Sequence, residues 1–268
     1  MPIRRSGPVR RRFGQHFLHD PGVIRRIIDA VAPVTGERIV EVGPGRGALT
    51  WGLLERARGL DVIEIDRDLA QALKADPRAK NGLQVHVENV LDTDFIRLRG
   101  SGEPLRVVGN LPYNISTPLL FHLLTQRVAI SDMYFMLQKE VVDRMAAQPG
   151  TKDYGRLTVM LAAVSEVEGL FDVGPGAFQP RPKVWSAIVH LRPTKNPRFD
   201  IGRDGALRTL VSAAFSHRRK TLRNSLKGLL TAQEIESCGI DPQLRPETLA
   251  PAQFGLLAAH YSRSVGYT

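Results

Sequence analysis

Asn110, Leu111, Pro112 and Tyr113 form a tetrad that follows an apolar run at residues 105–108. The Asn110 side-chain oxygen and the Leu111 carbonyl can accept hydrogen bonds from the exocyclic amine of adenine, whose lone pair is otherwise delocalised into the ring. Pro112 disfavours helical backbone at Leu111 and so holds that carbonyl in place. The Tyr113 ring can stack on a base turned out of its helix. The tetrad therefore predicts chemistry on a nucleobase amine, with an Asn-X-Pro turn beside a core tyrosine as the alternative.

A glycine-rich loop supplies the second candidate site. Residues 38–48 read RIVEVGPGRGA, which is typical of a strand that runs into a turn and then a helix. Gly43 and Gly45 allow a ligand to approach the backbone closely, and Gly47 permits the tight turn. Glu64 lies 21 positions after Gly43 at the end of the next apolar run, where an acid suits a ribose diol.

Glu41 narrows the choice of ligand for this loop. It stands two positions before the first glycine and gives the pattern ExGxGxG. That pattern resembles motif I of S-adenosylmethionine (SAM) methyltransferases, in which an acid lies near the amino-acid end of the cofactor. The loop therefore favours SAM. NAD and a simple surface turn remain alternatives, although nothing in the chain resembles the acid–base pair of a hydride-transfer enzyme.

The pattern of apolar runs predicts the elements that position these residues. Asp20 and Pro21 mark a helix start, as N-cap and first helical residue. Short apolar runs then alternate with helical stretches, which predicts a parallel sheet with helices on both faces. Strands are expected at residues 38–42, 61–65, 83–87 and 105–108, and helices from Leu49, from Asp68 and from Pro118 with Thr117 as its cap. Ligands bind at the carboxyl ends of such strands, where the loop and the tetrad stand.

The second half of the chain continues the sheet and then becomes helical. A strand is expected at residues 133–137, helices at 139–147 and 157–167, and a strand pair at 168–172 and 186–191. Residues 193–197 look like a linker, followed by helices at 205–215, 221–230, 231–238 and 251–261. We therefore expect a catalytic domain at residues 1–197, including a basic arm, and a basic helical domain at residues 198–268.

The charge of +10 is concentrated at the two ends of the chain. Residues 1–12 hold five arginines and no acid, residues 13–180 have a net charge of −3, and residues 181–268 have a net charge of +8. This distribution indicates a polyanionic partner such as RNA; a generally arginine-rich composition or an anionic membrane surface is the alternative. The candidate RNA contacts are Arg10, Arg11, Arg12, Arg218, Arg219, Lys220, Arg223 and Lys227. Of these, Arg219, Arg223 and Lys227 are spaced by four and are expected on one helical face.

Composition excludes several other classes. No apolar stretch approaches the roughly 20 residues of a membrane span, and no apolar segment of a secretory signal follows the N-terminal arginines. The single cysteine, Cys238, cannot form a disulfide framework or a zinc site. A cytoplasmic protein without a metal, a membrane association or an obligate protein partner is expected.

Four segments carry a resemblance to a known family. They are residues 12–18 (RFGQHFL), 110–118 (NLPYNISTP), 178–186 (FQPRPKVWS) and 215–224 (FSHRRKTLRN). They resemble segments of the ribosomal RNA adenine N6-dimethyltransferases of the KsgA type, which act on the small subunit (16S) RNA, and the similarity runs through nearly the whole chain. The resemblance implies a Rossmann-like SAM-dependent methyltransferase fold followed by a small C-terminal all-helical domain.

The resemblance also assigns roles. It implies that SAM is contacted by His16, Leu18, Gly43, Glu64, Asn89 and Asn110. Phe178 would stack on the target base opposite Tyr113, with a core phenylalanine as the alternative. The implied substrate is a pair of adjacent adenosines in the loop of the 3′-terminal hairpin of 16S rRNA within the immature small subunit. This would tie the protein to ribosome biogenesis and kasugamycin sensitivity.

Two residues depart from the family pattern. His16 stands where the family usually has Asn, although an imidazole can still form hydrogen bonds. Asn89 stands where the family usually has an Asp that accepts a bond from the cofactor's adenine amine. An amide oxygen can accept that bond without charge, so we expect SAM binding to be retained but weaker. Asp92 or Glu88 could compensate, and neutral drift is the alternative.

Other functions stay open at this stage. A 23S rRNA adenine methyltransferase of the macrolide-resistance type shares the loop and the tetrad, and only the C-terminal segment argues against it. A DNA adenine methyltransferase shares the tetrad but usually carries a larger target-recognition region. A mainly non-catalytic small-subunit assembly factor is a further alternative, for which methylation would be secondary.

Overall fold

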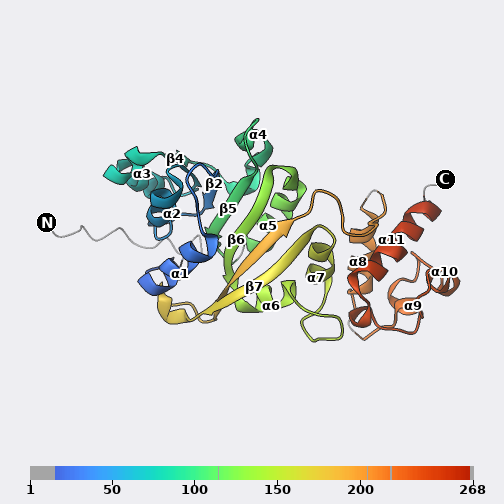
Figure 1. The fold of residues 1–268 in the computed structure, drawn as a ribbon. Helices are drawn as coiled ribbons and strands as arrows, with labels where there is room; N and C mark the ends of the chain where they lie inside the picture. Colours follow the sequence, from blue (N-terminus) through green and yellow to red (C-terminus); the bar gives the residue numbers. More distant parts are fainter. Residues whose placement is uncertain (1–15, 114, 204, 218, 266–268) are drawn as a thin grey trace. The chain divides into compact units, whose positions relative to one another are not determined.

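The computed structural model describes residues 16–113, 115–203, 205–217 and 219–265 (Figure 1). The chain divides into two compact units, one covering Met1–Lys139 with Leu170–His190, the other Glu140–Gly169 with Leu191–Thr268. Glu140–Gly169, which the sequence places with the catalytic domain, thus groups with the C-terminal helices. The domain boundary at residue 197 stays a prediction.

The first unit is built on a mixed sheet with the strand order β4-β3-β2-β5-β6-β9-β7. Adjacent strands from β4 to β6 pair in parallel, which confirms the predicted strand–helix alternation. The Lys139 N–H, just after β6, donates to the carbonyl of Trp185, just before β9, over 2.9 Å, so β9 runs antiparallel to β6. The strands are β2 Ile39–Val42, β3 Leu60–Ile63, β4 Leu83–His86, β5 Leu105–Asn110, β6 Ile130–Gln138, β7 Ser165–Val173 and β9 Ser186–Pro193.

Helices lie on both faces of this sheet because the chain winds outward in both directions from its centre. The connection from β2 to β3 moves one way and that from β5 to β6 the other, and right-handed crossovers then put α2 and α5 on opposite faces. The helices are α1 Pro21–Val31, α2 Thr50–Ala57, α3 Arg67–Ala75, α4 Phe95–Arg99, α5 Ser116–Thr125 and α6 Lys139–Met145. A separate two-stranded sheet pairs β1 Phe17–Leu18 with β8 Phe178–Gln179, which the sequence did not predict.

Local sequence signals predicted the start of α1 correctly and the start of α5 incorrectly. Asp20 caps α1 as predicted, since its carboxylate accepts the Val23 N–H at 3.0 Å. The predicted start at Pro118 with Thr117 as cap is wrong, because α5 begins at Ser116 and has no side-chain cap. Pro118 is the third helical residue, where its missing N–H has no partner within the helix in any case.

The apolar helix expected at residues 157–167 is shorter than predicted. Helix α7 covers Arg156–Ala162, and the chain is already extended in β7 from Ser165. The Val164 carbonyl accepts the Thr194 N–H at 2.9 Å, next to the end of β9. Pairing with β9 therefore ends the helix, and a run of apolar letters could not reveal that pairing.

The C-terminal part of the second unit, from residue 198 on, is helical in the described residues, as predicted. It contains α8 Ala206–Ala214, α9 Leu222–Ser225, α10 Ala232–Ser237 and α11 Pro251–Val265. A capping box starts α10, in which Thr231 Oγ1 accepts the Glu234 N–H and the Glu234 carboxylate accepts the Thr231 N–H. The helix expected at residues 221–230 is wrong in length, because Gly228 takes a φ of +91° and the chain turns instead of continuing the helix.

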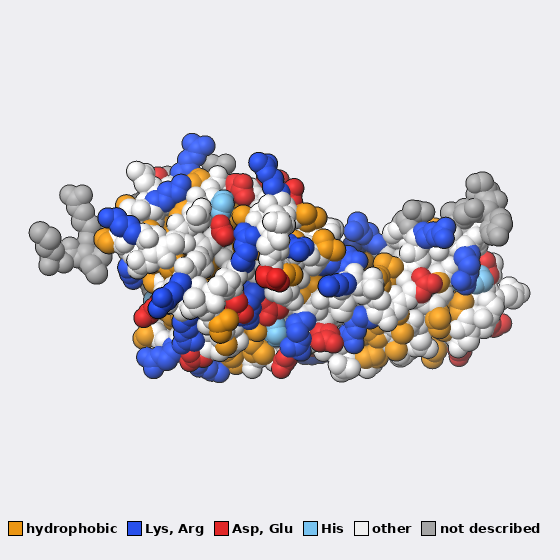
Figure 2. Space-filling model, turned by 45° about the horizontal axis from the view of Figure 1, so that its top comes forward, with side chains coloured by type: hydrophobic (Ala, Val, Ile, Leu, Met, Phe, Trp, Pro, Cys, Tyr) orange, Lys and Arg blue, Asp and Glu red, His pale blue; other side chains and the backbone are white. Residues whose placement is uncertain are grey.

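The surface of the described residues mixes both signs of charge. Figure 2 shows Lys and Arg side chains lying among Asp and Glu on the visible face. None of the helices in the described ranges has the length and apolar character needed to cross a bilayer. The exposed large hydrophobic side chains are Val34, Ile65, Val87, Ile96, Val128, Val184, Trp185, Leu244 and Leu256.

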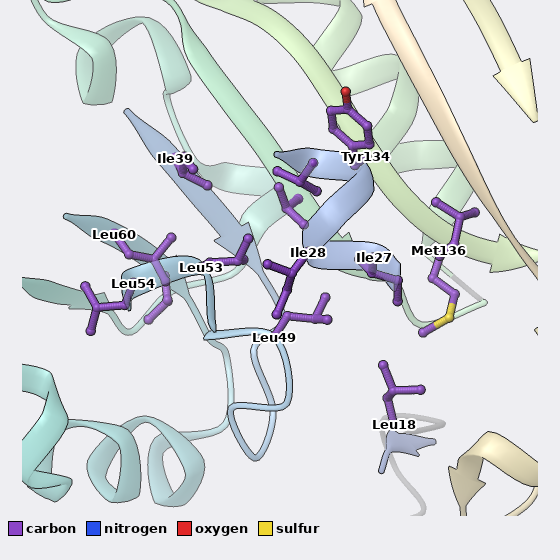
Figure 3. Close-up of a cluster of buried hydrophobic side chains, with 14 of the residues drawn as sticks. Leu18, Ile27, Ile28, Ile39, Leu49, Leu53, Leu54, Leu60, Tyr134 and Met136 are labelled. Carbon is purple, nitrogen blue, oxygen red and sulfur yellow. The ribbon is translucent and has the colours of Figure 1, made fainter. Parts of the chain in front are cut away.

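The core of the first unit fixes the sheet edge that carries the loop and the tetrad. Figure 3 shows side chains of α1 and α2, such as Ile28 and Leu53, gathered with strand residues such as Ile39 and Met136. Leu18 of β1 belongs to the same cluster and is 6% exposed. Burial of such side chains contributes about 1.5–3 kcal/mol each, so the cluster anchors β1 beside the sheet.

A pair of valines in the first unit tests this account. Val62 in β3 is fully buried and Val128 is 57% exposed. We expect Val62→Ala to lower the free energy of unfolding by about 2 kcal/mol, since it removes buried methyl groups and leaves a cavity. Val128→Ala should change it by less than about 0.5 kcal/mol. Urea denaturation of both variants measures the difference, and equal values would contradict the assigned core.

Candidate active site

A pocket opens at the carboxyl ends of β2 and β5, the two central strands from which the chain winds outward. Its empty space is about 1190 Å³ including the open mouth, enough for a small organic ligand. The predicted residues that line it are His16, Leu18, Gly43, Gly45, Glu64, Asn89, Asn110, Leu111, Pro112 and Tyr113. The fold thus brings the loop and the tetrad, far apart in sequence, to one cavity.

The glycine loop adopts backbone conformations that side chains disfavour. Gly43, Gly45 and Gly47 have φ values of +64°, +57° and +81°. A Cβ at Gly45 would lie 3.1 Å from the Phe17 ring, and one at Gly47 would lie 2.6 Å from Trp51 Nε1. The turn therefore favours glycine at all three positions for conformation, and at Gly45 and Gly47 for space as well.

Glu64 holds the loop in position. Its carboxylate accepts the Gly45 N–H at 3.1 Å and the Asp66 N–H at 2.9 Å, and the residue is only 3% exposed. Burial raises the pKa of Glu64, while the two backbone hydrogen bonds act in the opposite direction. The side chain therefore serves as a scaffold for the loop and still presents a carboxylate to the pocket.

Glu41 is the second buried acid of the pocket. It is 2% exposed, and its carboxylate accepts a 2.6 Å hydrogen bond from Thr50 Oγ1. Burial raises the pKa of Glu41 to about 8, the Thr50 hydrogen bond lowers it, and the nearby Glu64 raises it. At neutral pH the folded protein therefore keeps a proton on this carboxyl group.

The side-chain amide of Asn110 is oriented by the backbone of His16, the residue just before β1. Its Nδ2 donates to the His16 carbonyl at 3.1 Å. Because a carbonyl only accepts, the amide nitrogen must face His16, and Oδ1 is left as an acceptor on a pocket residue. The Leu111 N–H donates to the Met136 carbonyl at 3.2 Å, which fixes the backbone of the tetrad. Within the described residues, neither Oδ1 nor the Leu111 carbonyl has a hydrogen-bond partner.

Tyr113 and His16 form an aromatic corner of the pocket. Their ring centroids are 5.8 Å apart and the rings are tilted by 31°. The Tyr113 hydroxyl shares a 3.0 Å hydrogen bond with Ser186 Oγ, and His16 Nδ1 donates to the Pro180 carbonyl at 2.8 Å. Both rings are therefore held by residues 180–186, which lead into β9. A flat ligand can lie against them.

Similarity to known proteins identifies the family of this chain. The model of a family described as "Ribosomal RNA adenine dimethylase" matches residues 8–262. The chain belongs to this family. It is 54% identical over 250 residues to the ribosomal RNA small subunit methyltransferase A of Pseudomonas aeruginosa, covering 93% of each chain. The protein of the same name from Nitrosococcus oceani is 52% identical over 96% of this chain and 97% of its own length.

Solved structures agree with the family assignment. A dimethyladenosine transferase from Plasmodium falciparum superposes with a TM-score of 0.78 at 27% identity, covering 90% of this chain and 96% of that one. The 23S rRNA methyltransferase ErmE superposes with a TM-score of 0.69, also at 27% identity, covering 91% and 98%. The Rossmann-like methyltransferase fold with a helical C-terminal region, expected from the sequence, is thereby confirmed.

Asn89 is tied to its neighbours in this dimethylase. Its Oδ1 accepts the Leu91 N–H at 3.2 Å and its Nδ2 donates to the Asp92 carboxylate at 3.0 Å. Glu88, which also lines the pocket, accepts a 2.9 Å hydrogen bond from Thr93 Oγ1. Asp92 therefore orients the Asn89 amide. Asn89 lines the pocket and Asp92 does not, so the carboxylate of Asp92 lies behind the position where the family usually has an Asp.

Phe178 lies away from the cavity wall. It is 2% exposed, belongs to the core cluster of the first unit and pairs with Leu18 across β1 and β8. It does not appear among the pocket-lining residues. Its stacking on a target base remains a prediction that rests on the family resemblance.

Several pocket residues were missed in the sequence. Phe17 carries the Arg46 guanidinium over its ring at 4.4 Å, and Ile63, Ile65 and Val90 add apolar wall. Ile65 is adjacent to Glu64 and Val90 to Asn89, so each lies beside a residue already singled out. Their position next to predicted polar residues at strand ends could have identified them as pocket residues.

The basic residues of this dimethylase's second unit do not share a helix. Arg219 and Lys220 precede α9, and Lys227 follows it, so the expectation of one helical face for Arg219, Arg223 and Lys227 is wrong. Thr221 is extended with a ψ of 163°, which starts the helix only at the next residue. All four described cations are exposed, and Arg223 and Lys227 line one shallow groove. Arg10, Arg11, Arg12 and Arg218 lie outside the described residues.

Metal ligands do not gather in the part of the chain that the structure describes. No group of three His, Cys, Asp or Glu side chains there is arranged to hold an ion. Cys238 is partly buried, and burial raises the pKa of its thiol. The candidate site is therefore built from amide, carboxylate and aromatic groups.

The burial of Glu41 predicts a measurable pH dependence of stability. Its folded pKa of about 8 lies above the ordinary glutamate pKa of 4.5, so between these values the folded state holds a proton that the unfolded state releases. The free energy of unfolding then falls as pH rises through this window, by at most about 1.4 kcal/mol per pH unit. Glu41→Gln removes this effect and keeps an acceptor for Thr50.

Urea denaturation of both proteins at several pH values between 5 and 8 measures the difference. The stability of Glu41→Gln relative to the unmodified protein should rise steadily toward pH 8, because only the unmodified protein loses stability through this group. Glu64, whose pKa is also raised, is present in both proteins and cancels. A relative stability that stays constant across this range would contradict the assigned burial effect.

Proposed function

We propose that this protein transfers methyl groups from SAM to the N6 amine of adenosine in 16S rRNA, twice on each of two adjacent bases in the loop of the 3′-terminal hairpin. The observation that carries the proposal is the orientation of Asn110, whose amide nitrogen faces the His16 carbonyl and whose oxygen is thereby an acceptor on the pocket wall. The names of the relatives support the small subunit as the target.

The pocket residues fit SAM. The Glu64 carboxylate suits a ligand with positive charge and ribose hydroxyls, and the buried carboxyl group of Glu41 adds a further hydrogen-bonding group. The bare Cα atoms of Gly43 and Gly45 allow close approach, and Ile63 with other apolar side chains suits a flat base. His16, Leu18 and Asn89 would complete the cofactor contacts. When bound, SAM supplies an electrophilic methyl group with a neutral leaving group.

The residues of the chain position the amine and adjust its electron pair. In the first transfer Asn110 Oδ1 and the Leu111 carbonyl accept hydrogen bonds from the two N–H groups, and in the second transfer one of them accepts from the N–H that remains. These bonds favour a pyramidal nitrogen and free the lone pair for in-line attack. Pro112 restricts the backbone between them. Tyr113, fixed by Ser186, offers its ring to the extruded base, and Phe178 is proposed for the opposite face. The nitrogen carries a positive charge directly after the transfer and is then acidic, so its proton leaves to water without a strong base.

The substrate is proposed to be the immature small subunit, which places the protein in ribosome biogenesis in the cytoplasm. Exposed cations of the second unit, Arg219, Lys220, Arg223 and Lys227, are proposed to contact RNA phosphates, as are Arg10, Arg11, Arg12 and Arg218. Such contacts position RNA without reading its sequence. Selection of the two adenosines must therefore come from the surroundings of the pocket.

Methyl transfer from labelled SAM tests the proposal directly. Small subunits that lack the two dimethyladenosines are compared with 23S rRNA and duplex DNA as substrates. We expect label in dimethyladenosine near the 3′ end of 16S rRNA only. Label in 23S rRNA or DNA alone would keep the chemistry and overturn the substrate, and subunit binding without any transfer would favour an assembly factor.

Asn110→Ala should abolish most of the activity without loss of subunit binding. Removing one acceptor that acts in the transition state is expected to lower kcat by about 100-fold or more, because charge forms on the amine there. Single-turnover transfer to small subunits gives the rate, and co-sedimentation gives the binding. Asn81→Ala, which changes an amide at the end of a surface helical turn, serves as the control. Undiminished transfer by Asn110→Ala would contradict the assigned role.

The Asn89–Asp92 pair allows a sharper test of cofactor binding. Asn89→Asp alone would place a second carboxylate 3.0 Å from Asp92, where like charges repel. The double variant Asn89→Asp/Asp92→Asn exchanges the two groups and puts the charge beside the pocket. We expect the double variant to bind SAM about fivefold more tightly than the unmodified protein, since a charged acceptor strengthens a hydrogen bond. Calorimetric titration measures it, and equal affinity would remove Asn89 from the cofactor contacts.

A further inference from the structure

One short segment beside the pocket has properties that the reaction described so far does not use. Residues 180–185, called here the tryptophan loop, lead from β8 to β9. Trp185 is 56% exposed and its neighbour Val184 is 42% exposed. Trp185 is the one aromatic residue among the exposed large hydrophobics in the described ranges.

The tryptophan loop is fixed to the active site at both ends. At its start the Pro180 carbonyl accepts the His16 Nδ1–H at 2.8 Å, and directly after its end Ser186 Oγ bonds the Tyr113 hydroxyl at 3.0 Å. The Trp185 carbonyl accepts the Lys139 N–H at 2.9 Å. The indole lies against Gly174, where a Cβ would be 3.7 Å from its six-membered ring. The backbone on both sides of the exposed ring is therefore fixed, and the residue that follows Trp185 contacts the tyrosine of the tetrad.

The charge of the tryptophan loop is entirely positive. Arg181 and Lys183 are both exposed, and residues 180–185 contain no acid. Neither cation forms an ion pair with any residue in the described part of the chain. Asp172, near the end of β7, is paired with Lys139 at 3.2 Å. Two exposed cations within four residues before an exposed aromatic ring match the combination that proteins use for single-stranded nucleic acid.

We propose that Trp185 stacks on an unpaired base adjacent to the adenosine held in the pocket, while Arg181 and Lys183 contact the flanking phosphates. The inference rests on the proposed RNA substrate and deepens it. An isolated exposed hydrophobic side chain is ordinary, but here the ring, the cations and the connection to Tyr113 occur together. Stacking requires a base outside a duplex, so the tryptophan loop selects unpaired RNA around the target.

Fluorescence of Trp185 tests the stacking. The chain has two tryptophans, so Trp51→Phe leaves Trp185 as the single reporter. The titrants are a single-stranded oligoadenylate and a blunt RNA duplex with the same number of phosphates. We expect quenching by the single strand and little change with the duplex, since only the single strand offers free base faces. Equal responses to both would mean that phosphate attraction alone acts there and would overturn the proposal.

Binding and transfer assays with variants complete the test. Trp185→Ala should weaken oligoadenylate binding about tenfold and Trp185→Phe much less. Val184→Ala, the matched loss of an exposed apolar neighbour without a ring, should change it less than about twofold. Arg181→Ala and Lys183→Ala should each reduce the salt dependence of binding by about one phosphate contact. Trp185→Ala should also raise KM for small subunits and leave SAM affinity unchanged.

The outcomes separate this inference from the proposed function. Trp185→Ala with unaltered oligoadenylate affinity and unaltered KM would overturn the stacking role while methyl transfer to small subunits continues. Failure of the unmodified protein to methylate small subunits would overturn the proposed function, whatever the fluorescence shows.

Discussion

The close approach of β2 and β5 is the constraint on which the site depends. Gly109 pairs with Val42 in the parallel register, and a Cβ at Gly109 would lie 2.6 Å from the Val42 carbonyl oxygen. Real Cβ atoms do not come that close, so any side chain here would push the two strands apart. The glycine loop leaves β2 one residue after Val42, and the tetrad begins one residue after Gly109. A single bare Cα thus keeps the glycine loop and the tetrad within one cavity.

The electrostatics of the pocket follow from its depth. Glu41 and Glu64 are both almost completely buried, and within the described residues their hydrogen bonds come from a hydroxyl and from backbone N–H groups rather than from cations. Desolvation without a basic partner raises both pKa values. A pocket of this kind disfavours an anionic ligand, because a pyrophosphate would place negative charge beside two carboxyl groups whose ionisation burial already disfavours. A ligand with positive charge would instead favour their ionised forms, so the electrostatics agree with SAM better than with NAD.

Much of the framework was predictable because it is encoded locally. Alternating apolar runs predicted β2 to β5, and the Asp20 cap predicted α1, since both signals act within a few residues. The errors arose where distant partners decide. Pairing with β9 ended α7 early. The pairing of β1 with β8, which buries Phe178, has no local signal either, and the stacking role of Phe178 stays a prediction. The motifs located the pocket walls, but neither the tautomer of His16 nor the partner of Asn89 is visible in a string of letters.

His16 shows how a departure from the usual family residue can acquire a structural role. Its backbone carbonyl fixes the Asn110 amide, and its side chain donates from Nδ1 to the Pro180 carbonyl at the start of the tryptophan loop. One residue therefore connects the proposed amine acceptor to the proposed RNA platform. Because the carbonyl of Pro180 can only accept, Nδ1 carries the proton and, in the neutral ring, Nε2 keeps its lone pair. The neutral imidazole thus has an acceptor nitrogen at the pocket wall while its other nitrogen holds the start of the tryptophan loop, so one ring contacts both the proposed cofactor site and the segment proposed to bind RNA.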